Sequence, residues 1–174
     1  MNKIKAYYKD LLSYYKIANF LKEYINKDSI IVCIGTDRCI GDSLGPIVGS
    51  MLKHKNFPLN VYGTVDHPIH ALNIKEKLIQ IKSLHPKSNI LAIDACLGDK
   101  NSIGEIQARD YPVHPGKGVG KSLPDVGEIS IVGIVDSNQN TDLFNNTNIR
   151  LSLVTNMAKT ITDSLLHCFY MINE

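Results

Sequence analysis

Three short stretches of the sequence are apolar at most positions, and they constrain the fold more than any other feature. Ser29–Ile34 is rich in β-branched residues and shows no polar alternation, which is typical of a strand covered on both faces of its sheet. Ser88–Gly98 is predicted as a further strand that ends in a loop, and Glu128–Val135 as another buried strand. A sheet built from such strands needs a covering layer on each side.

Segments with the spacing of amphipathic helices alternate with these strands and supply the covering layers. The expected helices are Tyr8–Asn26, Leu44–His54, Ile69–Leu84 and Asn148–Ile172, and two further strands are expected at Asn60–Val65 and Ile103–Arg109. Alternating strands and helices predict an α/β fold of three layers, a mostly parallel sheet with helices on both faces. We expect one domain spanning residues 1–174.

Composition and charge exclude several classes of partner. The chain has 174 residues, 44% of them hydrophobic, and a formal net charge of +2 from 19 Lys and Arg against 17 Asp and Glu. That balance argues against nucleic acid and against an anionic membrane as partners. The first residues lack the apolar core of a secretory signal, and no apolar run is long enough to span a membrane. A cytoplasmic protein is therefore expected.

The four cysteines form no CxxC pair, which argues against a zinc knuckle or a disulfide framework. Cys33 and Cys168 are predicted to act as small hydrophobic residues in a strand and a helix. Cys39 and Cys96 fall in the loops that follow two strands. Cys96 is a candidate thiol nucleophile, but no histidine adjoins it in the sequence, so a packing role is expected.

The loop GTDRCIGDSLGP, which follows the first apolar strand, has the glycines of a phosphate-binding loop but carries acids. A P-loop reads GxxxxGK[ST], and its lysine neutralises phosphates. Here five residues separate Gly35 from Gly41, and Asp42 stands where the lysine belongs. The dinucleotide pattern GxGxxG is absent from the loop as well. The sequence therefore argues against a nucleotide site here.

Asp42 in this loop and Asp94 after the strand residues Ile90–Ile93 occupy corresponding places in the predicted sheet. Ligands of open parallel sheets bind beyond the carboxyl ends of the strands. If the two strands are neighbours, both carboxylates face one crevice. Asp42 alone would be explained as the N-cap of the next helix. An acid that ends an apolar strand, however, costs free energy unless it is paired or used, so the pair favours function.

Two carboxyl groups in one crevice can hydrolyse an amide or an ester in two ways. One acts as general base on a water molecule while the other stays protonated and polarises the carbonyl. Alternatively, both ligate a divalent metal that activates the water. We predict Asp42 and Asp94 as catalytic residues with no certain cofactor, and a divalent metal is the alternative.

Four segments in chain order resemble the YyaC proteins of spore-forming Firmicutes, a family described as spore proteases. They are CIGTDRCIGDSLGPIVG, VYGTVDHPIHALN, ILAIDACLG and GKGVGKSLPDVGEISIVGIV, and the match spans roughly Ser29 to Met157. Germination protease and the hydrogenase maturation endopeptidases are similar families. The resemblance implies their phosphorylase/hydrolase-like three-layer fold and a peptidase associated with sporulation.

The resemblance transfers roles to individual residues. Germination protease carries acids regarded as catalytic in a D-x-L-G-P motif and an I-D-A-L motif, which DSLGP and IDACL match here with Asp42 and Asp94. In the hydrogenase maturation enzymes, acids in these two loops bind nickel together with a histidine. His67, His70 and His114 are the candidates, and none lies in a matching motif. We take His70 as the metal candidate, with capping or packing at a helix start as its ordinary role.

Asp37 and Arg38 lie in the same turn as Asp42 and are predicted to bind substrate. Arg38 would hold a substrate carboxylate, or it would pair with Asp37 at the surface. Gly116–Lys121 is expected either to close over a peptide as a lid or to be an ordinary connection.

These residues together predict a sporulation-associated endopeptidase that acts on a peptide or protein, spore proteins among them. The alternatives are a maturation-type endopeptidase that binds nickel or another metal and a non-catalytic peptide-binding protein of the same fold. An oligomer is compatible with the sequence.

Overall fold

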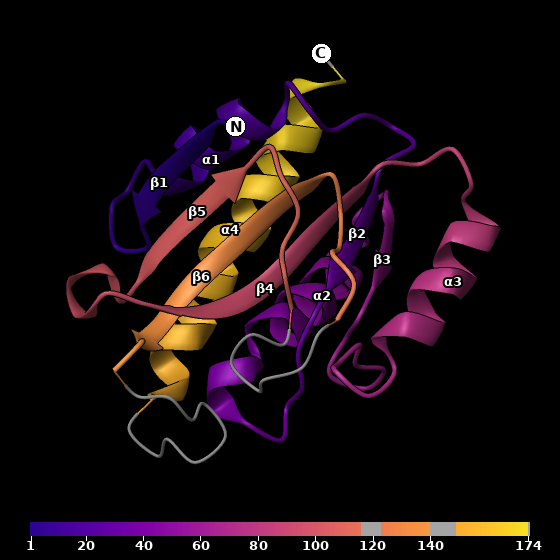
Figure 1. Ribbon diagram of the computed structural model, residues 1–174. Coiled ribbons are helices and arrows are strands. Elements are labelled where there is room, and N and C mark those ends of the chain that lie inside the picture. The colour runs from indigo at the N-terminus through magenta and orange to yellow at the C-terminus, as the bar shows by residue number, and fades with distance from the viewer. Residues whose placement is uncertain (116–122, 140–148, 174) are drawn as a thin grey trace.

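The computed structural model describes residues 1–115, 123–139 and 149–173, and six strands form one sheet (Figure 1). The strand order is β1-β5-β6-β4-β2-β3. Neighbours among β2, β3, β4 and β6 pair in parallel, whereas the β1–β5 and β5–β6 pairs are antiparallel. The strands are β1 (Lys3–Tyr7), β2 (Ile30–Cys33), β3 (Asn60–Tyr62), β4 (Ile90–Gly98), β5 (Glu105–Arg109) and β6 (Ile129–Ser137).

Helices cover both faces of this sheet, which confirms the predicted α/β class with a mostly parallel sheet between helices. One face carries three helices, and the other carries one helix together with residues 111–115 and 123–127, which cross in front of the sheet in Figure 1. The first three are α1 (Ser13–Leu21), α2 (Leu44–His54) and α4 (Leu151–Met171), and the fourth is α3 (Ile74–Leu84).

The two covered faces explain why β2 is apolar at every position. Ile31 and Cys33 belong to the core under α1, α2 and α4, whereas Ile30 and Val32 belong to the core under α3. None of these four side chains is more than 1% exposed. The prediction of two-sided burial is therefore confirmed, and Cys33 and Cys168 are buried core residues as expected.

The sequence prediction was wrong at the amino terminus. A helix was expected from Tyr8, but Lys3–Tyr7 forms β1 and the helix α1 begins only at Ser13. In β1, Ala6 is buried and Ile4 half-buried between exposed residues, so the strand alternates in the way that a strand with one covered face does. The Ser13 hydroxyl donates to the carbonyl oxygen of Tyr7 at 2.5 Å, which ties the end of the strand to the start of the helix.

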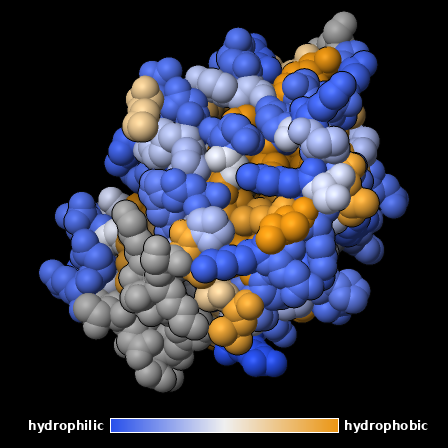
Figure 2. All heavy atoms as spheres, turned by 45° about the vertical axis from the view of Figure 1, so that its right-hand side comes forward, coloured by the Kyte–Doolittle hydropathy of each residue, from blue (hydrophilic) through white to orange (hydrophobic). Residues whose placement is uncertain are grey.

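The surface on the α3 side is mostly hydrophilic. Figure 2, which turns this side of the molecule forward, shows hydrophobic patches between hydrophilic residues, and Leu72, Ile79 and Leu84 are exposed in or beside α3. Among the described residues, no helix has both the length and the apolar character needed to cross a membrane.

Candidate active site

Asp94 lies inside β4, and not in the loop after it as the sequence suggested. The strand continues to Gly98, while β2 ends at Cys33, opposite Ile93. Asp94 therefore stands just beyond the carboxyl end of β2. Ile93 and Ala95 belong to the core under α1, α2 and α4, and because side chains alternate along a strand, Asp94 faces the opposite side, toward α3.

Asp42 ends a short 3-10 helix, η1 (Ile40–Asp42), which lies against β4, the strand that carries Asp94. The N-cap position of α2 belongs to Ser43, which makes no side-chain capping hydrogen bond. Capping of α2 therefore does not account for an acid at position 42. The strands β2 and β4 are neighbours in the sheet, which meets the condition stated from the sequence for the two acids to lie near each other.

Two glycines allow the backbone to pack closely around Asp42. Gly35 has a φ of 131°, and a Cβ there would lie 2.0 Å from the carbonyl oxygen of Asp42. A Cβ on Gly45, in the first turn of α2, would lie 2.2 Å from the carbonyl oxygen of Ile34. In addition, the Thr36 N–H donates to the Asp42 carbonyl oxygen at 3.0 Å. The position of Asp42 is thus fixed by direct contacts between backbones.

The surroundings raise the pKa of both carboxyl groups. Burial raises the pKa of Asp42 to about 6, and a hydrogen bond from the Thr36 backbone partly offsets that effect. Burial and then the negative charge of Asp42 raise the pKa of Asp94 well above its usual range, although the Ala95 N–H donates to Asp94 Oδ1 at 2.9 Å. The negative charge of Asp42 therefore opposes ionisation of Asp94.

Asp37 and Arg38, predicted to bind substrate, are both exposed. The backbone N–H of Arg38 donates to Thr36 Oγ1 at 3.3 Å. The ion pairs of the described residues are Lys5–Glu105 and His114–Asp125, so Arg38 does not pair with Asp37. The structure gives neither residue a contact that links it to Asp42 or Asp94, which are both half-buried.

His70 does not join the two acids in a metal site. The His70 ring Nδ1 accepts a hydrogen bond from the backbone N–H of Leu72 at 3.2 Å. The backbone N–H of His70 donates to Asn73 Oδ1 at 2.9 Å, just before α3. A neutral imidazole that accepts at Nδ1 carries its proton on Nε2 and offers no lone pair there. No three His, Cys, Asp or Glu residues within the described ranges are grouped to hold a metal ion. The residues present therefore do not fit a metal centre.

The other two candidate metal ligands, His67 and His114, are exposed. His67 is exposed, and its backbone N–H donates to Thr64 Oγ1 at 3.1 Å. His114 Nδ1 contacts Asp125 Oδ1. The two residues lie next to Val113 and Val126, which form an antiparallel bridge. The segment Gly116–Lys121, predicted as a lid, lies outside the described residues.

Cys96 is half-buried on β4, two residues after Asp94. Burial raises the pKa of its thiol to about 11; the charge of Arg109 lowers that pKa, and the charges of Asp94 and Glu105 raise it. At pH 8 only about one thiol in a thousand would be ionised. The thiol is therefore a poor nucleophile at neutral pH.

We expect Cys96→Ser to leave any hydrolytic activity within about twofold of wild type, because a protonated thiol does not act as a nucleophile. Alkylation of Cys96 by iodoacetamide, followed by peptide mass spectrometry, should be slow at pH 7 and accelerate up to about pH 11. Fast alkylation at pH 7 together with loss of activity in the serine variant would restore the thiol mechanism.

A row of polar side chains on β5 was not anticipated from the sequence. Ile106 and Ala108 belong to the core under α1 and α4, so Glu105, Gln107 and Arg109 face the same side as Asp94. The alternating pattern EIQAR was the available signal. It pointed to a strand with one polar face, but only the strand order β5-β6-β4 places that face beside the acids.

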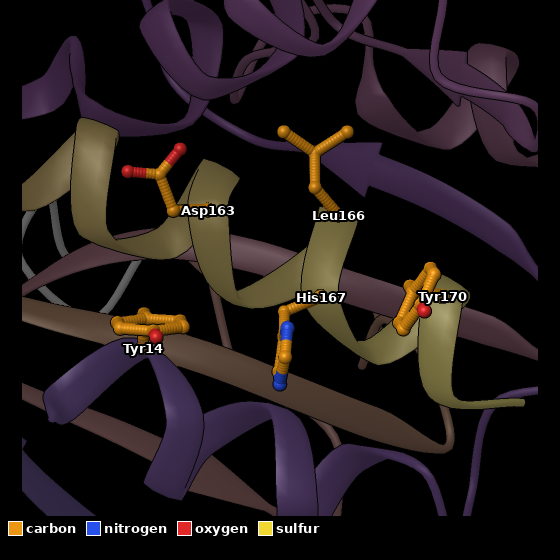
Figure 3. A pocket seen from close by; sticks show the side chains of 5 residues that line it. All are labelled: Tyr14, Asp163, Leu166, His167 and Tyr170. Atoms are coloured by element: carbon orange, nitrogen blue, oxygen red, sulfur yellow. The ribbon is translucent and has the colours of Figure 1, made fainter.

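A surface pocket between α1 and α4 lies apart from these residues (Figure 3). It holds about 380 Å³ and is lined by Tyr14, Asp163, Leu166, His167 and Tyr170. The His167 ring packs edge-on against Tyr14 with ring centroids 5.4 Å apart. None of the predicted site residues lines this pocket, which belongs to the helical layer on the opposite face from Asp94.

Comparison with known proteins places this geometry in a family. The family model described as "Protein of unknown function (DUF1256)" matches residues 5–164. The chain belongs to this family. It is also 44% identical over 150 residues to "Uncharacterized protein YyaC" of Bacillus subtilis (strain 168), which covers 86% of this chain and 73% of that protein. The matched residues of the DUF1256 family include both acids and the polar row of β5.

Proposed function

We propose that this DUF1256 protein is a sporulation-associated endopeptidase in which Asp42 and Asp94 activate a water molecule. The observation that carries the proposal is that burial raises both pKa values and that the charge of Asp42 raises the pKa of Asp94 further. We infer that Asp42, whose pKa is about 6, is the carboxylate of the pair in neutral solution, and that its charge keeps Asp94 a carboxylic acid. Such a pair supplies a general base and a general acid at the same pH.

The proposed proton movements follow from these two states. The Asp42 carboxylate takes a proton from the attacking water, whose oxygen bonds to the peptide carbonyl carbon. The Asp94 carboxyl group gives its proton to the carbonyl oxygen, which forms a neutral tetrahedral intermediate. When the C–N bond breaks, Asp42 returns its proton to the departing nitrogen, and Asp94 regains a proton from the intermediate as the new carboxyl group forms. The pair thus ends in its starting state.

The resemblance of DSLGP and IDACL to the acid-bearing motifs of germination protease supports this choice of reaction and the link to spore proteins as substrates. The ligand set described above does not support the metal-dependent alternative, so no step is assigned to a metal.

The test is hydrolysis of an unfolded spore-protein extract by wild type, Asp42→Asn and Asp94→Asn. We expect each variant to lose activity by about a hundredfold or more, because each removes one partner of a general acid–base pair. Asp37→Asn, an exposed acid in the same loop, is the matched control and should retain activity. Full activity in both Asp42→Asn and Asp94→Asn would refute the mechanism.

The dependence of kcat/KM on pH gives a second, independent readout. Activity should rise with pH through about 6 as Asp42 ionises and fall at higher pH as Asp94 loses its proton. A rate that is unchanged between pH 5 and 8 would contradict the assigned roles.

A further inference from the structure

Arg109 is a positive charge on the Asp94 face of the sheet, and no acid among the described residues forms an ion pair with it. Its guanidinium lies over the Tyr111 ring, 5.5 Å from the centroid. Its Nε and Nη2 both donate to Gln107 Oε1, at 3.2 and 2.6 Å. The ion pairs that the structure describes do not include it. A guanidinium group carries five N–H donors in a flat fork, so Arg109 has further donors available for an anion.

The side chains beside Arg109 hold it in place. The Gln107 amide is oriented by its Nε2, which donates to Glu105 Oε1 at 2.5 Å. Glu105 in turn pairs with Lys5 of β1 at 3.1 Å. Gln107 is only 6% exposed, so the amide that grips the guanidinium is itself fixed. A cation held in this way loses little conformational entropy when it binds an anion.

The register of the sheet places this cation near the acids. Gln107 pairs with Val132, and Val132 pairs with Asp94, so the three lie in one row across β5, β6 and β4. Two strand spacings, roughly 10 Å, separate the ends of that row. The Arg109 side chain runs back along β5 to Gln107 and so reaches the row. The charge of Arg109 lowers the pKa of the Cys96 thiol and the charge of Asp94 raises it. Both charges therefore lie near Cys96, which agrees with this placement.

We propose that Arg109 is the specificity residue of this site and binds a carboxylate of the peptide whose carbonyl group lies at Asp42 and Asp94. Gln107 is its positioning residue. The inference rests on the proposed function, and it assigns to Arg109 the substrate contact that the sequence suggested for Arg38. The separation of roughly 10 Å equals about three residues of extended peptide. The carboxylate belongs either to an acidic side chain or to the end of the peptide chain.

The test measures binding separately from hydrolysis. Protein labelled with 15N-arginine gives side-chain Nε signals from Arg38, Arg109 and Arg150. Three alanine-based hexapeptides serve as probes: one blocked at both ends with an internal Glu, the same peptide with Gln, and an unsubstituted one with a free carboxyl terminus. We expect the Arg109 signal to shift with at least one carboxylate peptide and not with the Gln peptide. The responding peptide identifies the source of the carboxylate.

Three variants complete the experiment. Arg109→Gln should weaken binding of the responding peptide by about ten- to a hundredfold, the usual loss for a hydrogen bond to a charged group. Gln107→Glu, nearly isosteric, should also weaken binding of that peptide, because the new carboxylate would form an ion pair with the Arg109 guanidinium and compete with the peptide carboxylate. Arg38→Gln, an exposed arginine, should bind as wild type does. Near-ultraviolet circular dichroism of each variant checks the fold.

The outcomes separate this inference from the proposed function. The inference is overturned if the Arg109 signal does not shift with either carboxylate peptide, even if peptides are hydrolysed. It is also overturned if Arg38→Gln is the one variant that loses binding. Binding at Arg109 without hydrolysis supports the inference as a binding site and counts against the peptidase.

Discussion

Asp94→Asn is expected to make the protein more stable at the same time as it abolishes hydrolysis. Burial and the charge of Asp42 raise the pKa of Asp94 in the folded state, so ionisation of this group opposes folding. Asparagine removes the ionisable group, and its Oδ1 can still accept the Ala95 N–H that Asp94 accepts at 2.9 Å. At pH 8 we expect a gain of about 2 kcal/mol or more in the free energy of unfolding, and a Tm higher by roughly 4–8 °C.

The sign of the pH dependence follows from linkage. A group whose folded pKa is raised contributes full stability below its unfolded pKa and loses it as pH rises toward the folded value. Wild type and Asp94→Asn should therefore be similar near pH 4 and diverge as pH rises. For Asp42→Asn the difference in stability from wild type should reach its full size by about pH 6 to 7, because the pKa of Asp42 is only about 6.

Thermal unfolding followed by circular dichroism between pH 4 and 8 measures these effects. Asp37→Asn is the control, since that acid is exposed and should change the Tm little. An Asp94→Asn protein that is less stable than wild type at pH 8 would mean that the Asp94 carboxylate is stabilised in the fold, contrary to the mechanism.

Gly45→Ala is expected to destabilise the protein severely. The first turn of α2 packs on the carboxyl end of β2 so closely that a Cβ at position 45 would lie 2.2 Å from the Ile34 carbonyl oxygen and 2.8 Å from its nitrogen. Both atoms belong to the backbone directly after β2, where Ile34 forms a bridge to Ile69, so neither can rotate away. We expect a loss of about 3 kcal/mol or more and a Tm lower by roughly 6–12 °C.

Gly98→Ala is the matched control for this prediction. There a Cβ would lie 2.9 Å from Cγ2 of the Ile134 side chain, with no backbone atom among its closest contacts. Because a side chain can adjust its rotamer, the expected cost is about 1 kcal/mol. Equal stability of the two variants in urea unfolding would show that the contact between α2 and β2 is not as close as described.

Much of the fold could be predicted from the sequence because buried strands and buried helix faces consist mostly of apolar residues. The lack of polar residues in Ser29–Ile34 predicted layers on both faces, and the helical spacing of Leu44–His54 matched α2. The two-residue alternation of Lys3–Tyr7 was the missed signal for β1, which lies at the edge of the sheet.

The site could be predicted only in part, because its assembly depends on strand order. Asp42 and Asp94 stood out since each follows apolar strand residues, and β2 and β4 proved to be neighbours. Arg109 did not stand out, because nothing local to EIQAR indicates that β5 lies two strands from Asp94. The metal set was implied by the resemblance to the hydrogenase maturation enzymes, which did not identify the histidine, and His70 uses its Nδ1 at the turn before α3.

The claim on which the mechanism depends is that Asp42 and Asp94 ionise in sequence, and titration by NMR tests it most directly. Carbon-13 spectra of the aspartate carboxyl groups, recorded from pH 3 to 9, should show Asp42 titrating at about 6 and Asp94 at higher pH. In Asp42→Asn the Asp94 transition should move to lower pH, because the opposing charge is gone. Two independent transitions near the ordinary aspartate value would contradict the account.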